Sequence, residues 1–390
     1  MRSQRLSSSP FNPMKITLSA HRPFHFVQLS NALISPANTV RLYSSAPRSF
    51  FRGLLDAVDL RFTPSPILLA SHVFPRLVDG PALDLDTVLY DRTVAALMPA
   101  TDIFFALATR ALRSAKASKL RGARFVLDRA CPHVHVQQTL LAREADRVGF
   151  RFRPQPQWLV DRQLEEYALA DAILIPSEYT RSSFPPELRS KLVLAPLLGR
   201  ISAMPSATSE ASSTFTVGVI GNSPLRKGYF YLLRAWKKLA LPNAKLLIRC
   251  AGGFEDYPAL KQLLLELPDV TLVPYISDLP AFYRGLDAFV LPSVDDGFGM
   301  ALFEALTSDV PVIATHACGA AELLTDRVDS LLVPPGNDDA LAEAILRLYE
   351  SKDLCRRLGE AGAGTAMRVQ ESRVYETAIR NLVARLADQG

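Results

Sequence analysis

Two carboxylates eight positions apart, Asp296 and Glu304, flank a loop whose residue types suit chemistry on a ligand. Gly297 and Gly299 lie between them, and a glycine lets the backbone approach a ligand where a Cβ atom would intrude. Carboxylates accept hydrogen bonds from hydroxyl groups, and the amide N–H groups at a helix N-terminus attract anions. The stretch therefore suits a ligand that combines a phosphate with a polyol.

Apolar and helical patterns on either side position this loop. Ala288 to Leu291 predicts a buried strand before it, and Met300 to Leu306 predicts the first turns of a helix after it. Gly221 to Gly228 follows another predicted strand and contains Arg226 and Lys227, two cations that suit a diphosphate. Ligands of open α/β sheets bind beyond the carboxyl ends of the strands, so both loops are candidate site segments. Taken alone, an Arg-Lys pair before a helix is more often simply solvated.

A third segment, Pro274 to Ser277, follows the predicted strand Val270 to Val273. A nucleotide base would fit there against the backbone and Tyr275. The ordinary alternative is that a tyrosine at a strand end packs into the core.

Strand-like and helical segments alternate through the chain, which predicts α/β architecture with two doubly wound parallel sheets. In the first half, the predicted strands are Lys15 to Ala20, Thr39 to Tyr43, Asp102 to Leu107, Arg124 to Asp128, Ala172 to Ile175 and Lys191 to Ala195. In the second half, they are Phe215 to Ile220, Lys245 to Cys250, Val270 to Val273, Ala288 to Leu291, Val310 to Ala314 and Ser330 to Val333. Predicted helices include Leu112 to Leu120, Val136 to Val148, Asp161 to Ala170, Asp353 to Ala363 and Glu371 to Leu386. Residues 44–90 show no clear period.

A chain of 390 residues is long for a single core, which favours two domains. Residues 202–214 are small, polar and without period, as linkers are, although a surface loop within one domain has the same composition. We expect a disordered extension over 1–13, one Rossmann-like domain over 14–200, a linker over 201–214 and a second Rossmann-like domain over 215–370. A helix over 371–390 would then pack back on the first domain.

The net charge is unevenly distributed between the two halves. Residues 1–200 carry 26 Lys and Arg against 16 Asp and Glu, a net charge of +10, whereas residues 201–390 carry 18 against 23, a net charge of −5. The basic residues that recur at near-helical spacing are Arg110, Arg113, Lys116, Lys119, Arg121 and Arg124, followed by Arg143, Arg147, Arg151 and Arg153. They form either a solvated helix face or a surface for anionic lipid headgroups, where each cation adds about 1 kcal/mol. Nucleic acid is not an expected partner, because no recognition motif accompanies the charge.

Three other features of the chain limit the class of protein to which it can belong. The four cysteines have no metal-ligand spacing, which favours a reduced cytoplasmic protein over a disulfide-stapled one. No apolar run approaches the ~20 residues that a membrane span needs. The first 14 residues lack the apolar region of a secretory signal. We expect a cytoplasmic protein, peripheral at the inner membrane face if the basic half contacts lipid.

Taken together, these segments resemble the donor-binding domain of retaining glycosyltransferases of family 4 (glycosyl transferases group 1), which have the GT-B fold. The resemblance covers about residues 215 to 365, and its signature is an acidic residue and a Glu separated by seven residues, here Asp296 and Glu304. It implies two Rossmann-like domains facing a cleft, an N-terminal domain for the acceptor and a C-terminal domain for a nucleotide sugar. It also implies transfer of a sugar from a nucleoside-diphosphate sugar to a glycan or lipid-linked acceptor, with retention, in polysaccharide biosynthesis.

The resemblance also assigns roles to residues. Lys227, with Arg226 or Asn222 nearby, would bind the donor diphosphate and support the departing nucleoside diphosphate. The remaining implied donor contacts are Glu304 with the ribose, Asp296 and the amides of Gly297, Phe298 and Gly299 with the sugar, and Tyr275 and Ile276 with the base. Lysine, arginine and a helix N-terminus stabilise negative charge on a phosphate without a metal, so neither a metal nor a cofactor is expected.

Histidines supply the candidates on the acceptor side. His133, after the predicted strand Arg124 to Asp128, best matches the family histidine that lies beside the sugar, and with Asp296 and Lys227 it completes the implied catalytic set. His135 lies two positions on, and in an extended segment only one of the pair faces a given side. His21 and His25 are weaker acceptor-side candidates. For any one of these residues, a structural role is the alternative.

The chain also departs from the family pattern. Asp296 stands where a longer glutamate is usual, and Asn222 stands where an arginine is usual. The glycine-rich loop near the first strand is replaced by Ser19 to His25, and Ser330 replaces a glycine. These departures keep open a second hypothesis, a catalytically weak or inactive GT-B-like protein that binds a sugar nucleotide or a partner. Another GT-B chemistry, such as epimerisation of a sugar nucleotide or glycan phosphorolysis, is a further alternative.

Overall fold

The computed structural model describes residues 14–22, 25–54, 56–63, 65, 80–198, 214–250, 254, 256–273 and 278–388. The chain divides into two compact units. Unit 1 consists of Met1–Arg129, Asp161–Leu174 and Glu376–Gly390, and unit 2 consists of Ala130–Val160 and Ile175–Tyr375. Each unit is described by itself below.

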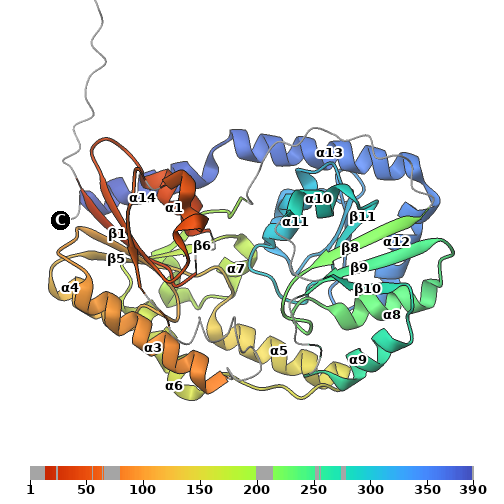
Figure 1. Ribbon diagram of the computed structural model, residues 1–390, viewed down its shortest axis with the longest axis horizontal. Helices are drawn as coiled ribbons and strands as arrows, with labels where there is room; N and C mark the ends of the chain where they lie inside the picture. Colours follow the sequence, from red (N-terminus) through yellow and green to blue (C-terminus); the bar gives the residue numbers. More distant parts are fainter. Residues whose placement is uncertain are drawn as a thin grey trace, which may run out of the picture. The chain divides into compact units, whose positions relative to one another are not determined.

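The first sheet has seven strands in the order β3-β2-β1-β4-β5-β6-β7, and β1 to β6 pair in parallel (Figure 1). The strands are β1 Lys15–Ser19, β2 Thr39–Ser44, β3 Asp59–Phe62, β4 Ile103–Leu107, β5 Arg124–Asp128, β6 Ala172–Ile175 and β7 Leu192–Leu194. The helices in this part of the chain are α1 Phe26–Leu33, η1 Arg48–Leu54, α3 Gly80–Leu97, α4 Leu112–Leu120, α5 Val134–Val148, α6 Gln157–Leu169, α7 Glu178–Ser182 and η2 Pro186–Lys191. The central strands are nearly continuous apolar runs because helices cover both faces of a parallel sheet.

The second sheet lies in unit 2 and has six strands in the order β10-β9-β8-β11-β12-β13, all paired in parallel. The strands are β8 Phe215–Ile220, β9 Ala244–Arg249, β10 Val270–Val273, β11 Ala288–Leu291, β12 Val312–Thr315 and β13 Leu331–Val333. The helices are α8 Tyr229–Leu239, α9 Pro258–Leu265, α10 Leu279–Arg284, α11 Met300–Leu306, η3 Gly319–Leu323, α12 Asp338–Glu350, α13 Lys352–Glu371 and α14 Val374–Ala387. The strand order reverses between β8 and β11, and such a switch point is where doubly wound sheets bind ligands.

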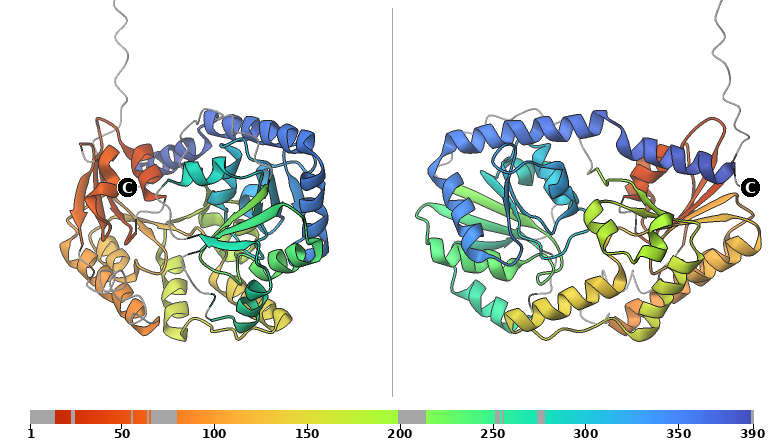
Figure 2. Two further views of the ribbon diagram at one scale, coloured as in Figure 1. Left: turned by 45° about the vertical axis from the view of Figure 1, so that its right-hand side comes forward. Right: turned by 180° about the vertical axis from the view of Figure 1, so that it is seen from behind.

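Helix α8 illustrates how the sequence builds the core of unit 2. Tyr229, Leu232, Leu233 and Trp236 are all buried, at the i, i+3, i+4 and i+7 positions that form one face of a helix. This face packs into a single apolar cluster with side chains of β8, β9 and α12. Helices lie on both faces of the sheet (Figure 2). The packing fixes the start of α8, where the predicted diphosphate loop ends.

The predicted fold class is confirmed, and every predicted strand is present within a few residues of its expected bounds. Several local expectations were wrong. Residues 44–90, for which the sequence predicts no elements, contain β3 and the first part of the 18-residue helix α3. The sequence also predicts that one helix ends at Ala363 and the next begins at Glu371, whereas α13 runs unbroken over 20 residues, Lys352–Glu371. Helix α6 begins at Gln157, four residues before the predicted start.

The compact units do not follow a single boundary near 201–214. Residues 130–160 and 175–200 group with the second sheet, and residues 376–390 group with the first unit. Residues 1–13 and 201–213, the predicted extension and most of the predicted linker, lie outside the described residues. The predicted domain boundaries therefore stay a prediction.

The basic residues of α4 are mostly engaged with acidic side chains of unit 1. Lys116 Nζ lies 2.7 Å from Glu165 Oε2, and Lys119 Nζ lies 2.7 Å from Asp171 Oδ2. Arg124 reaches the same Asp171 at 3.9 Å. The helix face predicted for lipid headgroups is therefore largely paired. In the part of the chain that the structure describes, no helix is long and apolar enough to cross a membrane.

Candidate functional site

The loop after β8 is fastened to the loop after β11 by backbone contacts. Gly228 has a φ of +67°, and a Cβ atom there would lie 1.9 Å from the carbonyl oxygen of Pro292. The N–H of Val294 donates to the carbonyl of Arg226 at 2.9 Å. Two of the predicted site segments are thus held side by side, at the carboxyl ends of adjacent strands of the sheet.

Three of the predicted donor-site side chains meet between these loops. Lys227 Nζ forms a short ion-pair contact with Asp296 Oδ2, and Arg226 Nη1 lies 3.5 Å from Asp296 Oδ1. Arg226 also donates to the carbonyl oxygen of Asp295 at 3.0 Å. Lys227 and Asp296 are both buried. The structure therefore brings together the cations predicted for a diphosphate and the carboxylate predicted for a sugar.

The electrostatics of this cluster keep Asp296 and Arg226 charged. Burial alone would raise the pKa of Asp296, but Lys227 and Arg226 outweigh it, and the pKa lies below its usual value. Burial alone would lower the pKa of Arg226, but the nearby Asp296 raises it above its usual value. An ionised, desolvated pair of this kind interacts strongly with any further charge that enters the site.

The loop around Asp296 is packed so tightly that only glycine fits beside it. A Cβ atom at Gly297 would lie 2.0 Å from the carbonyl oxygen of Ala130. The Gly297 carbonyl accepts hydrogen bonds from the hydroxyls of Ser177 at 2.6 Å and Thr180 at 3.2 Å. Segments from the first half of the sequence, assigned to unit 2, therefore hold this loop in place.

Asp295, the residue before the predicted carboxylate, has its own set of partners. Its side chain is fully buried and accepts hydrogen bonds from Gln137 Nε2 at 2.7 Å and from the Tyr179 hydroxyl at 3.0 Å. Sequence reasoning missed these three residues. The only local signal was the Asp-Asp pair, since Gln137 and Tyr179 are 158 and 116 positions away in the chain.

Glu304 lies on α11, as predicted, and is held by a tyrosine that the sequence did not identify. The Tyr283 hydroxyl donates to Glu304 Oε2 at 2.9 Å and also contacts the Ala301 carbonyl at 3.1 Å. Tyr283 is buried, and burial followed by the charge of Glu304 raises its pKa well above the usual value. The tyrosine therefore remains a hydrogen-bond donor to the carboxylate at any physiological pH.

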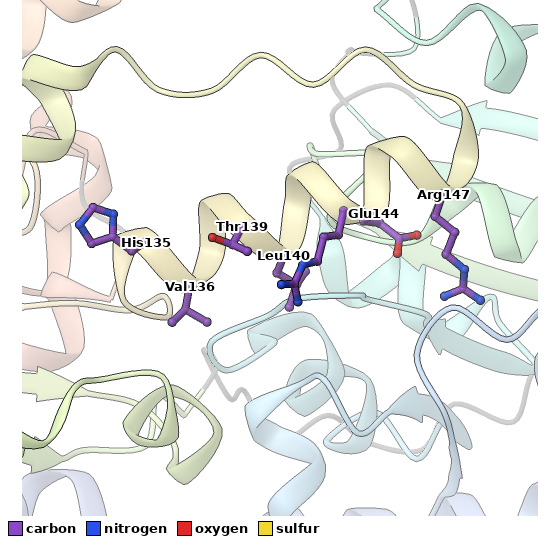
Figure 3. Close-up of a pocket in the computed structure, with 7 residues that line it drawn as sticks. His135, Val136, Thr139, Leu140, Glu144 and Arg147 are labelled. Carbon is purple, nitrogen blue, oxygen red and sulfur yellow. The ribbon is translucent and has the colours of Figure 1, made fainter.

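The predicted histidines of α5 lie in unit 2, whereas the other two lie in unit 1. His133 is the N-cap of α5 and is buried, with its ring centroid 5.3 Å from that of Phe184 and 5.5 Å from that of His135. His135 is exposed and lines a cavity of about 600 Å³ along α5, together with Thr139, Arg143 and other side chains of that helix (Figure 3). The two histidines are neighbours at a helix start, so the expectation from an extended segment does not apply.

In unit 1, His21 and His25 are each buried against a carboxylate at the carboxyl end of the sheet. His25 Nε2 lies 2.7 Å from Asp128 Oδ2, and His21 Nε2 lies 2.7 Å from Asp86 Oδ2. Asp86 also accepts a short hydrogen bond from the Ser65 hydroxyl. Burial lowers the pKa of His21 and outweighs the opposing effect of Asp86, so His21 is neutral at pH 7.

The other predicted site residues are less informative. Asn222 is exposed on the turn after β8. Phe298 is buried, and Gly299 has a φ of +88° at the N-cap of α11. Tyr275 and Ile276, predicted beside the base, lie outside the described residues.

Part of the chain matches a known protein family. Residues 203–365 match the protein family Glycosyl transferases group 1. The putative glycosyltransferase EpsD of Bacillus subtilis is 31% identical over 36% of this chain and 37% of its own length. The capsular polysaccharide biosynthesis glycosyltransferase CapM of Staphylococcus aureus is 29% identical over 39% of this chain and 41% of its own length. The chain thus matches about two fifths of the length of these relatives.

Solved structures match over almost the whole chain. Anabaena HepE in complex with UDP and glucose matches with a TM-score of 0.66 and 17% identity, over 97% of this chain and 100% of that one. The sucrose-phosphate synthase of Thermosynechococcus elongatus matches with a TM-score of 0.69 and 18% identity, over 96% and 98%. At this identity the likeness concerns the fold, and the fold is GT-B. The resemblance to glycosyl transferases group 1 is therefore confirmed over residues 203–365, and the GT-B fold is confirmed for the chain.

Proposed function

We propose that this protein transfers a sugar from a nucleoside-diphosphate sugar to a glycan or lipid-linked acceptor, with retention and without a metal, as family 4 enzymes do. The observation that carries the proposal is the buried cluster of Arg226, Lys227 and Asp296 at the switch point of the second sheet. Glu304 lies on the next helix, α11, which begins at the end of the same loop. Relatives named for capsular polysaccharide and lipopolysaccharide biosynthesis support a glycan acceptor.

The charges of the cluster suit the transfer step. The bond between the anomeric carbon and the diphosphate oxygen breaks, a bond to the acceptor hydroxyl oxygen forms, and the hydroxyl proton is released. Negative charge grows on the departing diphosphate, and Lys227 and Arg226 supply fixed positive charge where it grows. Lys227 is paired with Asp296 in this structure, so the donor phosphate would share the lysine with that carboxylate. Asp296 would hold the sugar, Glu304 the ribose, and His133 would face the sugar from the start of α5.

A thermal-shift screen against UDP-, GDP- and ADP-sugars tests the donor class, since a bound donor raises the melting temperature by mass action. Turnover with the donor that binds then separates the enzyme from the alternative, a GT-B-like protein that binds a sugar nucleotide without transfer. Proton NMR of the product reports retention or inversion at the anomeric carbon, and transfer in EDTA tests the proposed independence from metal. Absence of any melting shift would overturn the donor-site assignment.

A peripheral contact with anionic membrane is a second part of the proposal, and one observation in unit 1 favours it. A cavity of about 400 Å³ is lined by Arg41, Arg48 and Arg61. Asp59 contacts two of these arginines, at 2.6 Å from Arg41 Nε and 2.9 Å from Arg61 Nε, which leaves a surplus of positive charge. Phe62 and Leu97, which also line the cavity, are 56% and 61% exposed. Guanidinium groups beside exposed apolar side chains suit a lipid phosphate.

Sedimentation with vesicles tests this contact. Arg48→Ala is expected to weaken binding to vesicles of phosphatidylcholine and phosphatidylglycerol about fivefold, as removal of one juxtamembrane cation does. Lys116→Ala is the matched control, because Lys116 is already paired with Glu165. Equal binding to neutral and anionic vesicles would exclude the contact.

A further inference from the structure

Each of the two carboxylates proposed to hold the donor is positioned through a tyrosine hydroxyl that no motif predicts. Tyr283 contacts Glu304 directly, whereas Tyr179 contacts Asp295, the neighbour of Asp296. We propose that Tyr283 is a positioning residue for the nucleoside end of the donor and that Tyr179 is a positioning residue for its sugar end. The inference rests on the proposed function and extends it to residues outside the signature.

The Tyr283 contact is suited to orienting one carboxylate. Its hydroxyl lies 2.9 Å from Glu304 Oε2, and the ring is buried with edge-to-face contacts to Phe282 and Phe289. A ring packed in this way cannot follow the carboxylate if that group turns. A carboxylate accepts about four hydrogen bonds, so one bond from Tyr283 sets its orientation while leaving capacity for ribose hydroxyls. Without the hydroxyl, Glu304 would sample other rotamers in its partly exposed position.

Tyr179 does not contact the Asp296 carboxylate; its hydroxyl binds the side chain of the preceding residue, Asp295. Tyr179 and Gln137 hold the two oxygens of the buried Asp295 side chain, and Arg226 holds its carbonyl. The peptide that joins Asp295 to Asp296 is thereby fixed from both the side chain and the backbone. On the other side of Asp296, Ser177 and Thr180 hold the Gly297 carbonyl. The backbone on both sides of Asp296 is thus held by the segment Ser177 to Thr180 and by α5, while Lys227 and Arg226 contact the carboxylate itself.

A purely structural role would give a different result in each case. If the hydroxyls only stabilise the fold, their removal lowers the melting temperature and leaves the affinities of the folded protein for the nucleoside diphosphate and for the sugar nucleotide unchanged. If they position carboxylates, the two variants affect different ends of the donor. Loss of a hydrogen bond to a charged group weakens an interaction by roughly tenfold or more.

The experiment measures calorimetric affinities of Tyr179→Phe and Tyr283→Phe for a nucleoside diphosphate and its glucose derivative. The probe is whichever of UDP, GDP or ADP the wild-type protein binds. Tyr283→Phe is expected to weaken both ligands by the same factor, about tenfold, with kcat unchanged. Tyr179→Phe is expected to leave the nucleoside diphosphate unaffected, to weaken the sugar nucleotide about tenfold, and to lower kcat. Gln137→Leu should reproduce the Tyr179→Phe pattern.

Tyr231→Phe is the matched control, because Tyr231 donates a short hydrogen bond to the buried Glu144 away from this cluster. It removes the same chemical interaction and is expected to change neither affinity. If Tyr179→Phe weakens the nucleoside diphosphate as much as the sugar nucleotide, or if either Tyr179→Phe or Tyr283→Phe behaves like Tyr231→Phe, the inference is wrong. If wild-type protein binds none of the three diphosphates, the proposed function itself fails, and that result is distinct from the first.

Discussion

The carboxyl edges of the two sheets hold the same kind of pair, a buried carboxylate against a nitrogen base, but the two pairs differ in the charge of that base. In unit 2, Asp296 is paired with Lys227 and flanked by Arg226, and the shifted pKa values of Asp296 and Arg226 keep both groups charged at neutral pH. In unit 1, Asp86 is paired with His21, whose pKa is lowered by burial, so that the ring is neutral at pH 7. The first edge therefore carries charged groups, and the second carries a neutral histidine.

This difference matches the two sides of the proposed reaction. A departing diphosphate is stabilised by positive charge, and unit 2 supplies it from Lys227 and Arg226. An acceptor hydroxyl needs hydrogen-bond partners, and a neutral histidine both donates and accepts. On the proposed function, the donor would bind at the charged edge of unit 2 and the acceptor at the histidine edge of unit 1. The following substitutions test that division, from the largest expected effect to the smallest.

Removal of the lysine at the charged edge should have the largest effect. Lys227→Met is expected to lower the transfer rate about 10²- to 10³-fold, as loss of one group that stabilises developing charge does. The substitution also leaves Arg226 as the remaining cation beside the buried Asp296 carboxylate, so the melting temperature of the variant should fall. Adding Asp296→Asn to this variant should restore the melting temperature without restoring the rate. A rate within threefold of wild type would remove Lys227 from the donor site.

Close packing also distinguishes the loop around Asp296 from an open glycine position in unit 1. Gly297→Ala places a Cβ atom 2.0 Å from the Ala130 carbonyl, so we expect a cost of about 1–3 kcal/mol in the free energy of unfolding. Gly53→Ala in unit 1 is the control, since nothing lies within 4 Å of its Cβ position, and should cost less than about 0.5 kcal/mol. Urea denaturation measures both. Equal effects would show that the loop around Asp296 adapts easily.

The histidine edge of unit 1 is probed by a change at His25. His25→Gln is expected to lower the transfer rate about tenfold through loss of the contact with Asp128, while donor affinity stays unchanged. Steady-state kinetics with varied donor and acceptor separate the two effects. A tenfold loss of donor affinity instead would place His25 on the donor side and contradict the division.

The smallest expected effect is on the pH dependence of stability. The pKa of His21 is lowered in the folded protein, so the unfolded chain binds the proton more readily below about pH 6.5. His21 therefore contributes stability at pH 7.5 that is lost as the pH falls from about 6.5 towards its folded pKa. Asp296 also has a lowered pKa, but an acid of this kind loses its contribution only as the pH falls below about 4.

Urea denaturation of wild-type protein and His21→Gln at pH 7.5 and pH 5 measures this contribution. The wild-type protein should lose more of its free energy of unfolding between the two pH values than the variant. A smaller loss in the wild type would mean that Asp86 raises the pKa of His21 in spite of burial.

The sequence predicted the donor-side cluster because its residues lie in contiguous loops at strand ends. Arg226, Lys227, Asp296 and Glu304 follow strands that the apolar pattern identifies, and parallel strands bring their carboxyl ends together. The residues that hold these side chains could not be predicted in the same way. Tyr179 contacts Asp295 across 116 positions, and such a distance leaves no periodic trace.

On the unit 1 edge, prediction reached the histidines but not their partners. Asp86 lies on α3, in the region where mixed proline and apolar residues hide the helical period, so its pairing with His21 had no signal. Asp128 ends a predicted strand, yet only the fold brings it to His25, 103 positions away. Long-range polar pairs are set by tertiary packing rather than by local pattern.

A crystal structure of the protein with the sugar nucleotide that most raises its melting temperature tests the donor site most directly. We expect the diphosphate oxygens within hydrogen-bond distance of Lys227 Nζ and the Arg226 guanidinium, and the ribose hydroxyls beside Glu304. The sugar should lie against Asp296. A nucleotide bound elsewhere, with Lys227 still paired only to Asp296, would contradict the assignment of this cluster as the donor site.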